Sequence, residues 1–190
     1  MDDLFAPIAL HLRALALWQF EETIDGSLEY LKAEKAVLTI EKRAVPFGKR
    51  PRNWVLALQR HESFWRTKGR HPRENTRNRD TLPKPESRLG GWGRYQRRFE
   101  ENLSRYQIIR LDVSPSFRWD PHEEAWQKNL DACISHLMRT GRDPFHNSAD
   151  LVELALARWL GRQMRQLQHG TQPPDRASRL EAFLAMKPIR

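Results

Sequence analysis

The sequence predicts an all-α protein, with tandem three-helix bundles preceded by an N-terminal helical hairpin. Apolar residues recur at the spacing of amphipathic helices through most of the chain, and no segment alternates as a half-buried strand does. A set of Trp, Gly-Arg and Leu landmarks also occurs twice in the same order. We therefore divide the 190 residues into a hairpin over 1–50, a basic repeat over 53–120 and a second repeat over 121–190.

Residues 1–50 predict two amphipathic helices joined by a turn. The first covers 4–20, and Ser27 is expected to cap the second, which runs to about residue 40. The prolines and the glycine of 43–52 indicate a linker. An alternative interpretation makes this segment a degenerate first copy of the repeat. The two expected inner stripes are Leu4, Ile8, Leu12, Leu15 and Gln19, and then Leu28, Leu31, Lys35 and Leu38.

Residues 53–120 predict three helices around a long loop. Asn53 is a suitable N-cap for the first helix, and Gly69 is a suitable stop. The segment before the second helix has no periodicity and three prolines, so we expect a mobile loop. The expected elements are a helix over 54–68, a loop over 71–85, a helix over 85–102 and a helix over 104–113.

Residues 121–190 predict three further helices. Pro121 opens the first with an acidic turn, which suits the positive end of a helix dipole. A helix over 149–168 follows, and Pro173 and Pro174 open the last.

The landmarks of the two repeats match at offsets that drift between 67 and 72 residues. A drifting offset indicates one structural unit whose loops vary in length. The matching pairs are Trp54 and Trp126, Pro72 and Pro144, Trp92 and Trp159, and Leu111 and Leu180.

This repeated unit resembles the helicase-associated domain, a small helical module found in tandem in bacterial helicase-like proteins. The features that match are an opening Trp, the Gly69-Arg70-His71-Pro72 turn, the Leu-Gly-x-Trp-x-x-x-Gln-Arg helix from Leu89 to Arg97, and a closing Leu-Asp before an aromatic residue. The resemblance covers roughly residues 54–184 and implies a nucleic-acid-binding module. The family usually accompanies a helicase engine, and these 190 residues contain none.

The positive charge of the chain is concentrated in its middle third. The formal net charge is +9, whereas residues 41–110 alone carry 19 Lys/Arg against 7 Asp/Glu. Residues 1–40 are acidic, and residues 111–190 are close to neutral. Such an asymmetry favours a polyanionic partner, most simply nucleic acid.

Arginine binds phosphate oxygens in a forked geometry, so the basic side chains are the expected contacts. On a helical wheel, Arg94, Arg97 and Arg98 fall opposite the arc that holds Trp92 and Gln96. A merely solvated basic face is the alternative. The candidate nucleic-acid-binding residues are Arg66, Lys68, Arg70, Arg73, Arg77, Arg79, Arg94, Gln96, Arg97 and Arg98, with Arg158, Arg162 and Arg165 in the second repeat.

Catalytic and metal-binding patterns are weak. Cys133, His136 and His146 lack a fourth ligand and the close pairing of a zinc site. No phosphate-binding loop and no nucleophile signature occurs. We therefore expect no enzymatic activity, no metal and no cofactor. Four tryptophans are expected in the core rather than stacked on bases, namely Trp54, Trp92, Trp126 and Trp159.

The chain is expected to be cytoplasmic and nucleoid-associated. Its single cysteine suits a reducing compartment, its N-terminus is acidic where a secretory signal is basic, and no apolar run reaches the roughly 20 residues that span a bilayer.

The sequence thus predicts a non-enzymatic protein that binds DNA through the phosphate contacts of its middle repeat. Duplex is favoured, and single strands, RNA and the oligomeric state are left open. The alternative is a protein-interaction adaptor that docks a separate helicase or another DNA-processing partner.

Overall fold

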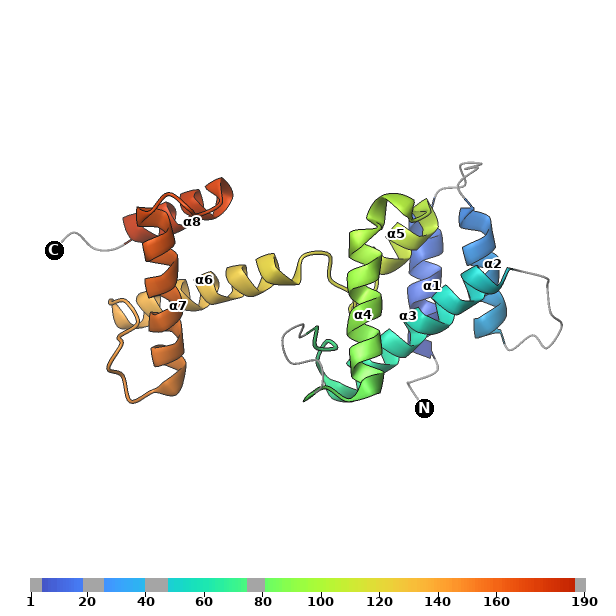
Figure 1. The fold of residues 1–190 in the computed structure, drawn as a ribbon, viewed down its shortest axis with the longest axis horizontal. Helices are drawn as coiled ribbons and strands as arrows, with labels where there is room; N and C mark the ends of the chain where they lie inside the picture. The colour runs from blue at the N-terminus through green and yellow to red at the C-terminus, as the bar shows by residue number, and fades with distance from the viewer. Residues whose placement is uncertain (1–4, 19–25, 40–47, 75–80, 187–190) are drawn as a thin grey trace. The chain divides into compact units, whose positions relative to one another are not determined.

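The computed structural model describes residues 5–18, 26–39, 48–74 and 81–186. Within these ranges the regular structure is helical and contains no strand, so the predicted all-α class is confirmed there (Figure 1). The elements are α1 (Phe5–Leu17), α2 (Ser27–Leu38), α3 (Lys49–Lys68), α4 (Lys84–Arg98), the 3₁₀ helix η2 (Glu100–Asn102), α5 (Arg105–Asp112), α6 (Pro121–Thr140), α7 (Leu151–Gln168) and α8 (Pro174–Ala185).

The chain forms two compact units, unit 1 over Met1–Trp119 and unit 2 over Asp120–Arg190. In unit 1, the helices α1 and α2 pack against α3 and α5 around one core. The segment 1–50 is therefore not a hairpin apart from the basic repeat, because its helices complete that repeat's core. The core residues are Ala14, Trp18, Tyr30, Ala33, Trp54, Val55, Leu58, Tyr106, Leu111, Val113 and Phe117.

The buried faces of α1 and α2 differ from the expected apolar stripes. On α1, His11 is buried while Leu12 is 57% exposed, and on α2, Glu34 is buried while Leu28 is 47% exposed. The reason is a polar contact that periodicity does not show. The Tyr106 hydroxyl donates to Glu34 Oε2 at 2.7 Å and lies 2.7 Å from His11 Nδ1. Hydrogen bonding lets these polar groups occupy the interior.

Some helix starts also differ from expectation. The helix α3 begins at Lys49 rather than after Asn53, because Pro51 falls in the first turn, where a backbone N–H has no intrahelical acceptor. Ser27 is the first residue of α2 rather than its cap, and its hydroxyl accepts from the backbone N–H of Tyr106 at 3.0 Å. The helix α5 begins one residue later than expected, because Ser104 is its N-cap, in a reciprocal capping box with Gln107.

A buried ion-pair cluster ties the helices of unit 1 together. Arg110, which is fully buried on α5, donates from Nε to Glu34 at 2.8 Å and from Nη1 to Glu62 at 2.8 Å. Ser114 donates to the same Glu62 carboxylate at 2.8 Å. Each buried charge is thus paired and hydrogen-bonded, as burial requires.

Unit 2 consists of α6, α7 and α8 around a smaller core. Asp120 caps α6 by accepting from the backbone N–H groups of His122 and Glu123, and Asp150 caps α7 by accepting from the backbone N–H of Val152. The core residues are Trp126, Leu130, Cys133, Leu137, Trp159, Leu160, Leu180 and Phe183.

Candidate nucleic-acid interface

A Trp–Gln hydrogen bond occurs at corresponding places in both units. In unit 1, Trp54 Nε1 donates to Gln96 Oε1 at 2.9 Å. In unit 2, Trp126 Nε1 donates to Gln163 Oε1 at 2.8 Å. Both glutamines are buried, so Gln96 links α4 to α3 and does not face solvent as a nucleic-acid contact would.

A buried glutamate fixes the loop that enters α4. Glu86 Oε1 accepts from Arg70 Nη1 at 2.6 Å, from the Arg73 backbone N–H at 2.9 Å and from Arg73 Nε at 3.0 Å. The side-chain hydrogen bonds from Arg70 and Arg73 hold the Glu86 pKa well below its usual range. The charges of these two arginines are therefore partly neutralised by a protein carboxylate.

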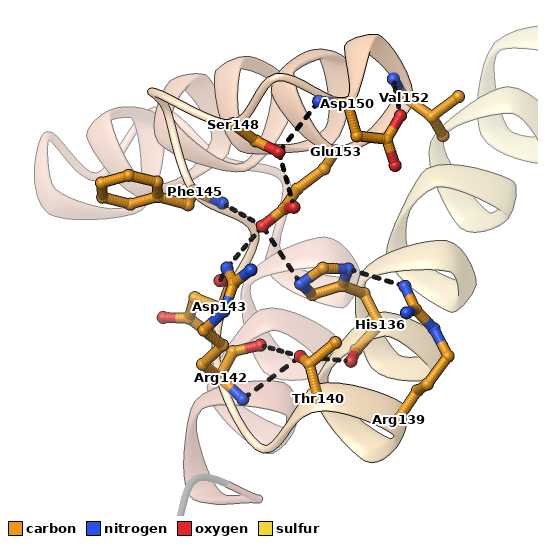
Figure 2. Close-up of polar contacts among 10 residues, drawn as sticks. All are labelled: His136, Arg139, Thr140, Arg142, Asp143, Phe145, Ser148, Asp150, Val152 and Glu153. Atoms are coloured by element: carbon orange, nitrogen blue, oxygen red, sulfur yellow. Dashed lines mark hydrogen bonds and ion pairs between the residues drawn. The ribbon is translucent and has the colours of Figure 1, made fainter.

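Unit 2 contains the same arrangement around Glu153, on the first turn of α7 (Figure 2). Its carboxylate accepts from Arg142, from the Phe145 backbone N–H at 3.0 Å and from Ser148 Oγ at 2.8 Å. The hydrogen bonds from Arg142 and Ser148 lower the Glu153 pKa to about 2. His136 Nε2 lies 3.4 Å from the same carboxylate. This polar cluster anchors the loop before α7.

The predicted orientation of Arg97 is wrong. Its side chain is only 17% exposed and forms an ion pair with Glu74, while Nη1 donates to the Arg118 carbonyl at 2.9 Å. Its guanidinium also lies over the Phe117 ring. A loop carboxylate, which helical periodicity does not reveal, turns Arg97 toward the protein.

Other predicted contacts remain at the surface of unit 1. Arg98 and Lys68 are exposed, Arg66 and Arg94 are half-buried, and Arg98 lies over the Phe99 ring at 5.4 Å. Neither Arg94 nor Arg98 forms an ion pair with a described residue. Arg77 and Arg79 lie outside the described residues.

The three predicted arginines of unit 2 lie on one face of α7. Arg158, Arg162 and Arg165 are spaced by four and three residues, and all are exposed. The only carboxylate on α7 is the buried Glu153. This helix therefore presents positive charge alone to solvent.

Sequence reasoning missed a hollow between α3 and α4. We define the α3–α4 seam as Arg50, Asn53 and Ala57 on α3 together with Trp92, Tyr95 and Gln96 on α4, which all line a hollow of about 290 Å³. The sequence signal for this face was the i, i+3, i+7 spacing of Arg50, Asn53 and Ala57 on α3. The same spacing places Arg60 on that side of the helix. Tyr30, Trp54, Leu103 and Gln107 complete the lining.

Most of the candidate catalytic and metal groups lie in the core, whereas His146 is exposed. His61 is buried, 3.0 Å from the hydroxyl of buried Ser116, and burial lowers its pKa to about 4. Cys133 is buried, and burial raises its pKa to about 11. The described residues contain no cluster of three or more His, Cys, Asp or Glu that would hold a metal ion.

No helix among the described segments combines the length and the apolar character needed to cross a membrane. Comparisons of the chain with protein-family models, with curated proteins and with solved structures find no match.

Proposed function

We propose that this chain is a non-enzymatic nucleic-acid-binding protein that engages DNA mainly through phosphate contacts of unit 1. One observation carries the proposal. The helices α3 and α4 contain a single carboxylate each, Glu62 and Glu86, and both are buried. The charges that these two helices present to solvent are therefore all positive. The exposed basic residues are Lys49, Arg50, Arg52, Arg60, Lys68, Lys84, Arg88 and Arg98.

A helix face that served only solubility would have a different charge pattern from this surface. Solubility is served by interspersed charges of both signs, whereas a one-sign surface raises the local concentration of a polyanion. Arginine outnumbers lysine on α3 and α4, and its planar fork suits phosphate oxygens.

We further propose that α3–α4–α5 and α6–α7–α8 are two copies of one three-helix unit, as in the helicase-associated domain that the sequence resembles. The repeated Trp–Gln bond and the repeated glutamate anchor support this proposal. The corresponding helix of unit 2, α7, then offers a smaller basic face through Arg158, Arg162 and Arg165.

Fluorescence anisotropy with a labelled random-sequence duplex tests the binding proposal. Log Kd should rise linearly with log salt, and Arg60→Ala with Arg98→Ala should flatten the slope by up to about 1.8, near 0.9 for each lost phosphate contact. The matched control removes two exposed charges elsewhere in unit 1, Arg13→Ala with Lys32→Ala, and should leave the slope near that of the wild type.

Two results contradict the proposal. Binding that does not weaken with salt excludes a phosphate-dominated contact. Equal effects of the two double variants show that net charge alone, rather than the α3–α4 surface, sets the affinity.

The alternative function, a protein-docking adaptor, is favoured by one feature of unit 2. Large apolar side chains are exposed around the start of α7 and the end of α6, with Leu151 77% exposed and Met138 74% exposed. Salt-insensitive association with a protein partner, together with no affinity for DNA or RNA, would establish this alternative.

A further inference from the structure

The α3–α4 seam has the composition of a site for a planar aromatic ligand. Its hollow of about 290 Å³ lies at the small end of the roughly 300–1,000 Å³ typical of ligand pockets, so it suits one ring system rather than a chain. Four of its lining residues are aromatic, and others carry amide groups that both donate and accept hydrogen bonds. The aromatic residues are Tyr30, Trp54, Trp92 and Tyr95. Of the amide residues, Gln96 and Gln107 are buried and hydrogen-bonded within the protein, and Asn53 is exposed.

Tyr95 lines this hollow and is held in place. Its side chain is 56% exposed, although an isolated tyrosine on a surface helix has little reason to be fixed. The ring packs on Phe99 with centroids 4.6 Å apart, and the guanidinium of Arg98 lies over the same Phe99 ring at 5.4 Å. Phe99 thus supports the partly exposed Tyr95 ring and also contacts a cation, and single-strand binders combine such aromatic and cationic groups.

Asn53 and Arg50 face the hollow from α3. Both are exposed, and the Asn53 side chain forms no hydrogen bond with a described residue. A carboxamide can pair with the edge of a base, and a guanidinium can bind the phosphate that follows it. The seam therefore offers stacking, edge recognition and charge within one hollow.

We propose that the α3–α4 seam receives one unpaired nucleobase, stacked on Tyr95, so that the chain prefers single-stranded nucleic acid to duplex. The inference rests on the proposed function and deepens it, because phosphate contacts alone do not distinguish the two forms. A base within a duplex is stacked on both faces and cannot enter a hollow of this kind without being unpaired.

The test compares three labelled probes of equal length with the full-length protein, namely an oligothymidylate, an abasic oligodeoxynucleotide and a duplex. The wild type should bind the oligothymidylate most tightly. Tyr95→Ala should weaken that binding by about tenfold, in the range expected for one stacked base, and leave the abasic probe unaffected. Tyr95→Phe should retain wild-type affinity, because the aromatic ring remains.

Two further variants separate the hollow from general effects. Ala57→Leu fills the hollow from α3 without changing charge and should also weaken only the oligothymidylate. Phe145→Ala removes an aromatic side chain of similar exposure from unit 2 and should change no affinity. Melting temperatures of all variants verify that the fold is retained.

The failures of the two proposals are distinguishable. In one outcome, the wild type binds all three probes in a salt-dependent way while Tyr95→Ala changes none of the affinities. That result overturns base binding at the α3–α4 seam and leaves the phosphate-binding proposal intact. Equal wild-type affinities for the oligothymidylate and the abasic probe overturn it as well. A wild-type protein that binds none of the probes overturns both proposals.

Discussion

The Arg110 cluster allows a quantitative test of the interior of unit 1. Arg110→Met keeps the side-chain volume roughly constant but leaves Glu34 and Glu62, which are 0% and 2% exposed, without their counter-ion. Three charge-assisted hydrogen bonds of 2.8, 2.8 and 3.2 Å are lost. Breaking a buried ion pair from one side typically costs about 3–5 kcal/mol. Since about 1 kcal/mol shifts the melting temperature of a domain this size by roughly 3–6 °C, we expect a decrease of about 10–25 °C.

The loss of stability in Arg110→Met should also depend on pH. Burial raises the Glu34 pKa, but the hydrogen bond from His11, the charge of Arg110 and the hydrogen bond from Tyr106 together hold it below its ordinary 4.5. A lowered native pKa contributes stability above pH 4.5 that is lost as the pH falls. In Arg110→Met the uncompensated carboxylates bind protons more readily. The difference from the wild type should therefore be largest at neutral pH and shrink below about pH 4.5.

Thermal unfolding followed by circular dichroism at pH 7 and pH 3 measures both effects. Arg60→Met, which removes an exposed arginine of α3, is the control and should shift the melting temperature by little, since exposed charges contribute about 0–1 kcal/mol. A loss below about 1 kcal/mol for Arg110→Met at pH 7, or a loss that is equal at pH 7 and pH 3, would refute this account of the cluster.

Five further variants, in three comparisons, test other contacts. Gly90→Ala should destabilise by about 1–3 kcal/mol, because its Cβ would lie 2.5 Å from a loop carbonyl, whereas Gly91→Ala has open space and should stabilise by about 1 kcal/mol in urea unfolding. Arg97→Ala should lower the melting temperature clearly more than Arg98→Ala does, because only Arg97 is enclosed and ion-paired. Glu153→Gln should destabilise unit 2 at pH 7 but not below pH 2, because a native pKa near 2 supplies stability that is lost between about pH 4.5 and pH 2; equal destabilisation at both pH values would contradict this.

Periodicity predicted the helices and most of the aromatic core. Trp54, Trp126 and Trp159 are buried as expected, and Trp92 packs partly against the core of unit 1. These residues follow the 3.6-residue repeat, so local sequence suffices to orient them. The same reasoning failed for α1, where an apolar Leu12 is exposed beside a buried His11.

The remaining features depend on partners far apart in sequence. Glu34 and Arg110 are 76 residues apart, and each alone is typical of a solvated helix face. Arg97 and Arg98 are neighbours on one helix, and the partners that hold Arg97 inward, the Glu74 carboxylate and the Arg118 carbonyl, both lie outside α4. The α3–α4 seam likewise depends on how two helices cross. No single-helix pattern contains this information.

Under the proposed repeat, the glutamate anchors explain where the three-helix unit tolerates changes in length. Arg73 and its anchor Glu86 are 13 residues apart, whereas Phe145 and its anchor Glu153 are 8 apart. Under the proposed repeat, this difference of five residues accounts for the change in offset from 72 to 67 residues. Because each carboxylate fixes both ends of its loop, extra residues cost only the slowly growing entropy of closing a longer loop. The two anchors therefore hold the starts of α4 and α7 in place although the connections before these helices differ in length.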